Sequence, residues 1–225
     1  GVTYSNYFSL NINSKNFDIY NLLLLCSDFF GKCLILDLKN KYIEYLFKRN
    51  INIESIKKFS IGHSDSIYFF INENYKSNNL TYSKLEYIGI LYKNKYGIYI
   101  NKFSNRLIFP IKNLYGKIIG FGGRVLNNDL PKYINSYESV FFSKKKELYG
   151  FFECRSYSND SYVIIVEGYF DVILLHQNDI KNVVSPLGTS ISNYHFVLVY
   201  RYYNRLVLCF DGDKAGKDAC FRSFN

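Results

Sequence analysis

The sequence Val-Glu-Gly-Tyr-Phe-Asp-Val at residues 166–172, together with Cys-Phe-Asp-Gly-Asp-Lys-Ala-Gly at residues 209–216, decides the fold of this chain. Each stretch adjoins an apolar run of the length of a buried strand. Between the two, the pattern predicts a helix, a strand and a second helix. This alternation predicts a parallel sheet with right-handed crossovers. The expected elements are strands at residues 162–166, 182–185 and 205–210, and helices at residues 170–177 and 192–200.

The upstream part of the chain follows a different pattern. Its first third carries apolar residues at helical spacing, and short apolar runs flank a turn at Tyr115-Gly116. The expected elements are helices at residues 17–30, 38–47 and 53–59, a β-hairpin of residues 107–111 and 118–121, and a helix at residues 151–157.

A polar linker at residues 158–161 separates these two patterns, whereas residues 63–101 give only weak signals. We therefore predict an α+β amino-terminal subdomain, residues 1–160. An α/β subdomain with a Rossmann-like parallel sheet, residues 161–225, follows it.

Acidic residues stand where two of the predicted strands end. Glu167 follows the first strand, and Asp211 and Asp213 follow the last. In a parallel sheet both strand ends meet at one edge, where carboxylates can hold Mg²⁺ while the ion keeps part of its water. The alternative is that an acid such as Asp213 only caps the next helix. Asp171 lies one helical turn beyond Glu167. It is interpreted either as a residue that orients a ligand or the adjacent backbone, or as a solvated acid in the first turn of the helix.

Composition narrows the class of protein. The 225 residues carry a net charge of +9, which indicates either a polyanionic partner or the codon bias of an AT-rich genome, and composition does not separate the two. Five cysteines without a C-x-x-C pair predict reduced thiols, with neither a disulfide framework nor a zinc site. The longest apolar stretches are predicted to be too short to span a membrane. Because the chain begins at Gly1 and lacks methionine, we expect the start of the gene product to lie upstream.

These acidic motifs and several motifs upstream of them occur in the same order as in bacterial-type (DnaG-type) DNA primases, which the chain resembles. The RNA-polymerase catalytic core of these primases contains a Toprim domain. The acidic motifs at residues 166–172 and 209–216 are similar to Toprim domains in general, which topoisomerases and some nucleases share. The upstream set narrows the resemblance to primases. It comprises residues 42–62, 106–111, 120–126, 131–136, 142–144 and 147–150, and residues 185–190 also match.

The resemblance implies a function and a set of site residues. A primase core is a nucleotidyltransferase, a DNA-directed RNA polymerase that makes short RNA primers on single-stranded DNA during DNA replication. Glu167, Asp211 and Asp213 would hold catalytic Mg²⁺, with Mn²⁺ as a substitute and Asp171 in support. The residues that match nucleotide-binding and template-binding positions are Arg106, Arg124, Lys132, Tyr133, Asn135 and Lys144.

The chain also departs from the family pattern. The run Lys144-Lys145-Lys146 has lysine where the family carries glycine, and Ser143 stands where the family carries histidine. The family's further acidic pair would lie beyond Asn225, so the chain is interpreted as a fragment that by itself lacks part of the metal site.

The resemblance further implies partners and location. The expected partners are a single-stranded DNA template, ribonucleoside triphosphates and, through a region outside this sequence, a replicative helicase. No membrane association is expected, and the location would be the bacterial cytoplasm, at the nucleoid, or a plastid-like organelle matrix. Two alternatives remain open: a Toprim nicking or topoisomerase-like enzyme, and a non-catalytic fragment that binds single-stranded DNA.

Overall fold

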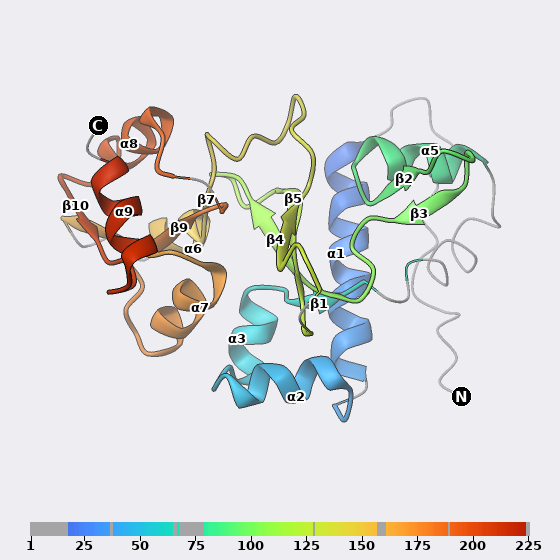
Figure 1. Ribbon diagram of the computed structural model, residues 1–225, viewed down its shortest axis with the longest axis horizontal. Helices are drawn as coiled ribbons and strands as arrows, with labels where there is room; N and C mark the ends of the chain where they lie inside the picture. Colours follow the sequence, from blue (N-terminus) through green and yellow to red (C-terminus); the bar gives the residue numbers. More distant parts are fainter. Residues whose placement is uncertain are drawn as a thin grey trace.

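The computed structural model describes residues 18–36, 38–64, 67, 79–127, 129–156, 161–188 and 190–223. Parts of four predicted segments lie outside these residues: the first residue of the helix at 17–30, the last residue of the helix at 151–157, most of the linker at 158–161, and much of the weakly patterned stretch at 63–101. Figure 1 shows a central group of yellow-green strands, with orange and red strands on its left and the long blue helix α1 on its right.

Three helices open the described chain: α1 (Ile19–Leu36), α2 (Lys41–Lys48) and α3 (Ile53–Lys58). Asn40 caps α2, because its side chain accepts hydrogen bonds from the backbone N–H groups of Tyr42 and Ile43. Asn52 caps α3 in the same way by accepting the N–H of Ser55 at 2.8 Å. The three predicted helices are therefore present, and α1 continues past the predicted end.

The expectation that every apolar stretch is too short to span a membrane was wrong for α1. By length and composition alone, this 18-residue helix could cross a membrane. Leu23, Cys26 and Phe30 are nevertheless fully buried, and the ring of Phe30 meets that of Phe121 at 5.7 Å. A buried core helix meets the same length and composition criteria, and packing on the adjacent sheet accounts for these apolar residues.

An antiparallel sheet in the order β1-β4-β5-β6 forms the middle of the molecule. The predicted hairpin is confirmed as β4 (Arg106–Lys112) and β5 (Ile118–Val125), and β5 runs further than expected, through Gly122 and Gly123. A Cβ on Gly122 would lie 2.6 Å from the ring of Tyr169, so this glycine lets α7 pack closely on the sheet. The flanking elements are β1 (Gly62–His63), β6 (Tyr133–Asn135), α5 (Asn79–Tyr87) and the small hairpin of β2 (Leu91–Lys93) and β3 (Tyr99–Asn101).

The second sheet has the order β10-β8-β9-β7. Its strands β10, β8 and β9 are parallel, as the alternating pattern predicted, and β7 joins the edge antiparallel to β9. The elements of this part are β7 (Leu148–Tyr149), α6 (Phe151–Arg155), β8 (Tyr162–Ile165), α7 (Tyr169–Gln177), β9 (Val183–Pro186), α8 (Asn193–Tyr200), β10 (Arg205–Leu208) and α9 (Lys214–Arg222).

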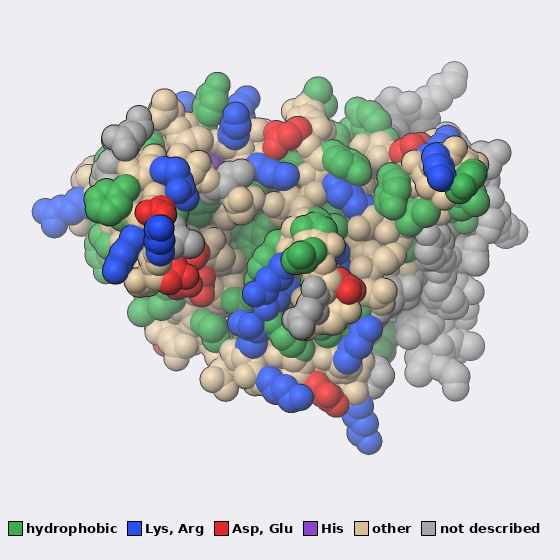
Figure 2. Space-filling model, viewed as in Figure 1, with side chains coloured by type: hydrophobic (Ala, Val, Ile, Leu, Met, Phe, Trp, Pro, Cys, Tyr) green, Lys and Arg blue, Asp and Glu red, His purple; other side chains and the backbone are tan. Residues whose placement is uncertain are grey.

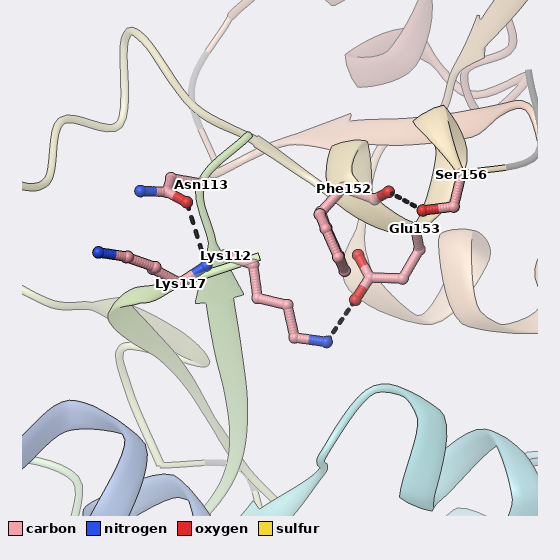
Figure 3. Close-up of polar contacts among 6 residues, drawn as sticks. All are labelled: Lys112, Asn113, Lys117, Phe152, Glu153 and Ser156. Atoms are coloured by element: carbon pink, nitrogen blue, oxygen red, sulfur yellow. Dashed lines mark hydrogen bonds and ion pairs between the residues drawn. The ribbon is translucent and has the colours of Figure 1, made fainter. Parts of the chain in front are cut away.

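Polar contacts join segments that are distant in sequence. Gln177, at the end of α7, accepts hydrogen bonds from the N–H of Asn52 at 2.9 Å and from the hydroxyl of Ser55 at 3.0 Å. Its amide nitrogen donates to the carbonyl of Asn50 at 2.7 Å. Figure 3 shows a second link, in which the Lys112 ammonium on β4 lies 2.6 Å from Glu153 Oε1 on α6. These contacts fix α7 and α6 against the amino-terminal helices and the central sheet.

Candidate functional site

Two carboxylates meet at the carboxyl edge of the parallel sheet. Strands β8 and β10 are neighbours in register, with Ile165 opposite Leu208. Glu167 and Asp211 follow these strands, and Glu167 Oε1 accepts the backbone N–H of Asp211 at 2.9 Å. We call Glu167 and Asp211 the acidic pair. One carboxylate oxygen of Glu167 thus anchors the neighbouring loop, and its second oxygen is not needed for that contact.

Asp213 has a different position from the acidic pair. It is the N-cap of α9, and its Oδ1 accepts the N–H of Gly216 at 2.8 Å. The structure therefore places Asp213 in the capping arrangement that was the alternative to metal binding. Gly216 is needed for this packing, because a Cβ there would lie 2.2 Å from the carbonyl oxygen of Asp211 and 2.6 Å from Glu167 Oε1.

Asp171 lies in the first turn of α7 and completes its amino-terminal cap. Its Oδ2 accepts the N–H of Gly168 at 3.0 Å. Partial loss of water raises the pKa of the Asp171 carboxyl above its ordinary value; the Gly168 hydrogen bond opposes this shift, and nearby Asp211 adds to it. Asp171 thus orients the backbone that follows Glu167 and adds negative charge next to the acidic pair.

The acidic pair lines a cavity of about 360 Å³. Residues of the amino-terminal part line the same cavity. On the face shown in Figure 2, Asp and Glu side chains gather between α9 and α7, with Lys and Arg side chains grouped near the ends of β4 and β5. Among the predicted site residues, the cavity brings together Arg124, Lys132, Tyr133, Asn135, Glu167, Asp171 and Asp211.

Two arginines form the positive wall of this cavity. The Arg49 guanidinium carbon lies 4.9 Å from the ring centre of Phe170 and 5.1 Å from that of Tyr45. Arg124 lies against the same two rings, at 4.9 and 5.3 Å. We call Arg49 and Arg124 the arginine pair. Within the described residues, neither forms a salt bridge with a carboxylate, and the buried Nε of Arg124 has no hydrogen-bond partner. The aromatic rings hold both cations and leave their charge available to an anion.

Arg49 was not among the predicted site residues, although it lies in the stretch of residues 42–62 that resembles the family. It stands at the carboxyl end of α2, directly after Lys48, where a basic residue is also expected for helix stability. A cation at a helix end next to aromatic residues was the available signal, and it does not by itself distinguish a ligand site from a helix cap.

Arg106 lies outside this cavity. Leu107 is the register partner of Arg124, so Arg106, one residue earlier, points to the opposite face of the sheet. Its guanidinium donates to the carbonyls of Pro131 and Lys132, at 3.0 and 3.3 Å. Burial lowers the pKa of Arg106, opposed by the negative charge of Asp129. In this structure Arg106 supports the loop that carries Lys132.

Tyr133 and Asn135 already make contacts in the cavity wall. The Tyr133 hydroxyl accepts a hydrogen bond from Arg124. Asn135 accepts from the hydroxyl of Tyr169 and donates to the carbonyl of Leu187 at 2.8 Å. Asn135 therefore links β6, α7 and the loop after β9, which gives it a structural role besides any contact with a ligand. Lys144 lies outside the cavity, in a loop beside α8.

The donor set of the acidic pair fits a hard divalent cation. Within the described residues, no group of three or more His, Cys, Asp or Glu side chains is arranged to hold a metal ion. Mg²⁺ does not require such a cage, because it is commonly bound by one or two carboxylates, with waters and substrate phosphates completing its shell. Glu167 and Asp211 supply two carboxylates, and the arginine pair lines the same cavity.

Comparison with known proteins agrees with this architecture. The part that contains the parallel sheet and the acidic pair matches the family model of the Toprim domain, over residues 161–225. Residues 29–155 match the model of the amino-terminal domain of the DNA primase catalytic core. The chain therefore belongs to the DNA primase catalytic-core family, as the DnaG-type resemblance predicted.

Individual relatives support this assignment. The DNA primase of Rickettsia prowazekii is 42% identical over 222 residues, which are 96% of this chain and 37% of the relative. That of Salmonella typhimurium is 38% identical over 207 residues, 92% of this chain and 36% of the relative. The chain thus spans little more than a third of the length of these relatives.

Solved structures show the same fold. A DNA primase domain from Pseudomonas aeruginosa superposes with a TM-score of 0.84 at 35% identity, covering 92% of this chain and 65% of that one. A DnaG primase catalytic domain bound to single-stranded DNA gives a TM-score of 0.80 at 35% identity, covering 91% and 66%.

Proposed function

We propose that this chain is part of the catalytic core of a DNA primase, which joins ribonucleotides into short RNA on a single-stranded DNA template with Mg²⁺. One observation carries the proposal: the acidic pair and the arginine pair line the same cavity. Such a cavity suits a metal-bound triphosphate, because carboxylates take the cation and guanidinium groups take the phosphate oxygens.

Each wall of the cavity has a distinct part in this function. Glu167 and Asp211 hold Mg²⁺, with Asp213 in the adjoining loop and Asp171 in support. Bound there, Mg²⁺ would supply the positive charge that lowers the pKa of a 3′ hydroxyl and stabilises a pyrophosphate leaving group. Arg49, Arg124 and Lys132 bind the triphosphate, and the ring of Tyr133 lies where it can contact the base or sugar.

Template binding and cellular context form the rest of the proposal. A relative in this family was solved with single-stranded DNA, and the net charge of +9 is compatible with such a ligand. Lys144 and its neighbouring lysines are proposed to contact the template backbone. The protein would act in the cytoplasm of a bacterium or in an organelle matrix, with a replicative helicase as partner of the longer protein.

The test is RNA synthesis on single-stranded DNA with ribonucleoside triphosphates and Mg²⁺. It is carried out with this chain, with a version extended past Asn225, and with Glu167→Gln in the active version. Glutamine keeps the oxygen that accepts the Asp211 N–H, so a loss of synthesis would report the removed charge rather than a disrupted fold. We expect short RNA from the parent and at least about a hundredfold less from the variant.

Two other outcomes would replace the proposal. Binding of DNA without RNA synthesis in any version would leave a single-stranded DNA-binding role. Nicking or relaxation of supercoiled DNA under the same conditions would favour the topoisomerase-like alternative.

A further inference from the structure

Three consecutive lysines meet the amino-terminal turn of α8 through three separate contacts. His195 Nε2 lies 3.1 Å from the carbonyl oxygen of Lys144. The hydroxyl of Ser192 donates to the carbonyl of Lys145. The Lys146 ammonium lies 5.4 Å from the ring centre of Tyr194. We call residues 143–147 the lysine loop; it belongs to the amino-terminal part of the chain, whereas α8 belongs to the Toprim part.

Both ring nitrogens of His195 form hydrogen bonds that together connect α8 to this loop. Its side chain is fully buried, and its Nδ1 accepts the backbone N–H of Ser192, the helix cap, at 3.2 Å. Because Nδ1 is the acceptor, a neutral ring carries its hydrogen on Nε2 and donates it to Lys144. Burial lowers the pKa of His195, although its backbone hydrogen bonds oppose the shift, and this lowering favours the neutral ring.

The lysine loop is held in place by hydrogen bonds to its backbone. Among the described residues, Lys144, Lys145 and Lys146 form no salt bridge with a carboxylate. The Lys144 side chain also lies near Lys102, whose pKa is lowered to about 8, by burial first and by Lys144 second. Besides α8, Glu138 holds the loop, by accepting the N–H of Lys144 at 3.0 Å. Within the loop only Glu147 carries a negative charge, and Lys146 acts on it electrostatically. The loop therefore keeps a net positive charge, which attracts phosphates.

We propose that His195 is a positioning residue that, with Ser192, presents the lysine loop to the backbone of the nucleic acid. Through α8, the Toprim part would set where a basic loop of the other part stands. This inference rests on the proposed role of the loop in template binding. His195 itself, being fully buried, touches no nucleic acid.

The test compares four variants for their affinity for a fluorescent single-stranded DNA oligonucleotide over a range of salt concentrations. The variant with Lys144→Ala, Lys145→Ala and Lys146→Ala measures what the loop contributes. His195→Leu removes both ring hydrogen bonds, and His195→Gln keeps a donor for the Lys144 carbonyl. His176→Leu is the matched control, because His176 is also buried but contacts the carbonyl of Val183, away from the loop.

We expect the triple variant to reduce the salt slope of binding by up to about 2, at ~0.7 for each phosphate that is no longer neutralised. His195→Leu should show at least a threefold loss of affinity and part of the same decrease in slope, His195→Gln should recover most of both, and His176→Leu should leave them unchanged. Trypsin should cleave the lysine loop of folded His195→Leu faster than that of the parent or of His176→Leu.

The outcomes distinguish the role of the lysine loop in nucleic-acid binding from the positioning role of His195. If the triple variant binds like the parent, the loop has no role in nucleic-acid binding and that part of the proposed function fails. If the triple variant binds weakly but His195→Leu binds like the parent, or only as weakly as His176→Leu, the positioning role of His195 is overturned.

Discussion

The carboxylate of Glu167 accepts the backbone N–H of Asp211 across two neighbouring parallel strands, at 2.9 Å. This hydrogen bond fixes the spacing of the acidic pair before any cation binds. Glycine at position 216 makes the contact attainable, because α9 begins directly against both residues.

Gly216→Ala is therefore expected to destabilise the protein, by about 1–3 kcal/mol, since the added methyl group would overlap the Asp211 carbonyl and the Glu167 carboxylate. At this chain length the melting temperature should fall by about 2–4 °C per kcal/mol. Gly212→Ala is the control, because a Cβ at Gly212 would have no atom within 4 Å. Equal melting temperatures for the two variants would show that α9 does not pack on the acidic pair as described.

Arg49 and Arg106 should respond in opposite ways to substitution. Arg49→Gln is expected to weaken binding of a Mg²⁺-bound ribonucleoside triphosphate by about tenfold or more, the usual effect of losing a charged hydrogen bond, with little change in thermal stability. Arg106→Gln should instead lower the melting temperature, because the carbonyls of Pro131 and Lys132 lose their donor. Nucleotide titration and thermal unfolding of both variants check this; the reverse pattern would place Arg106 at the ligand and Arg49 in the framework.

The ion pair of Lys112 and Glu153 should stabilise the contact between β4 and α6. Both side chains are largely buried, with 17% and 9% of their surface exposed. Lys112→Met leaves a buried carboxylate unpaired and is expected to cost about 3 kcal/mol of the free energy of unfolding. The double variant Lys112→Met, Glu153→Leu should recover most of that loss. Denaturant unfolding measures both, and a double variant no more stable than Lys112→Met would contradict a charge-based explanation.

The protein should lose stability as the pH falls from about 6.5 toward 4. Burial lowers the pKa of His176 from 6.5 to about 4, so in this range the unfolded chain takes up a proton that the folded chain does not. The effect of this residue is at most about 3 kcal/mol. His176→Gln should flatten the dependence of the melting temperature on pH across this window. An unchanged dependence would mean that His176 does not titrate on unfolding in the way its burial implies.

Local patterns predicted much of the fold and the acidic half of the site. Glu167 and Asp211 each follow an apolar run, and the alternation of strand and helix was enough to place both at one sheet edge. Local patterns did not predict the arginine pair: Arg124 was expected only from the resemblance to primases, and Arg49 was not assigned to the site. The resemblance assigned both Arg106 and Arg124 to the site. The strand register, with Leu107 opposite Arg124, places the two arginines on opposite faces of the sheet. Arg49 reaches the cavity because α2 packs on α7, a contact between distant segments that no local pattern encodes.

The hydrogen bonds of Gln177 bear on the biosynthesis of this protein. Its partners Asn50 and Asn52 precede it by 127 and 125 residues. During translation, the end of α2 that carries Arg49 therefore leaves the ribosome on the order of ten seconds before α7 exists to receive it. In that interval the cavity lined by Arg49, Glu167 and Asp211 cannot form, because the last two residues have not yet been added. If the cavity binds nucleotide as proposed, that ability would arise only after both halves of the chain have been made.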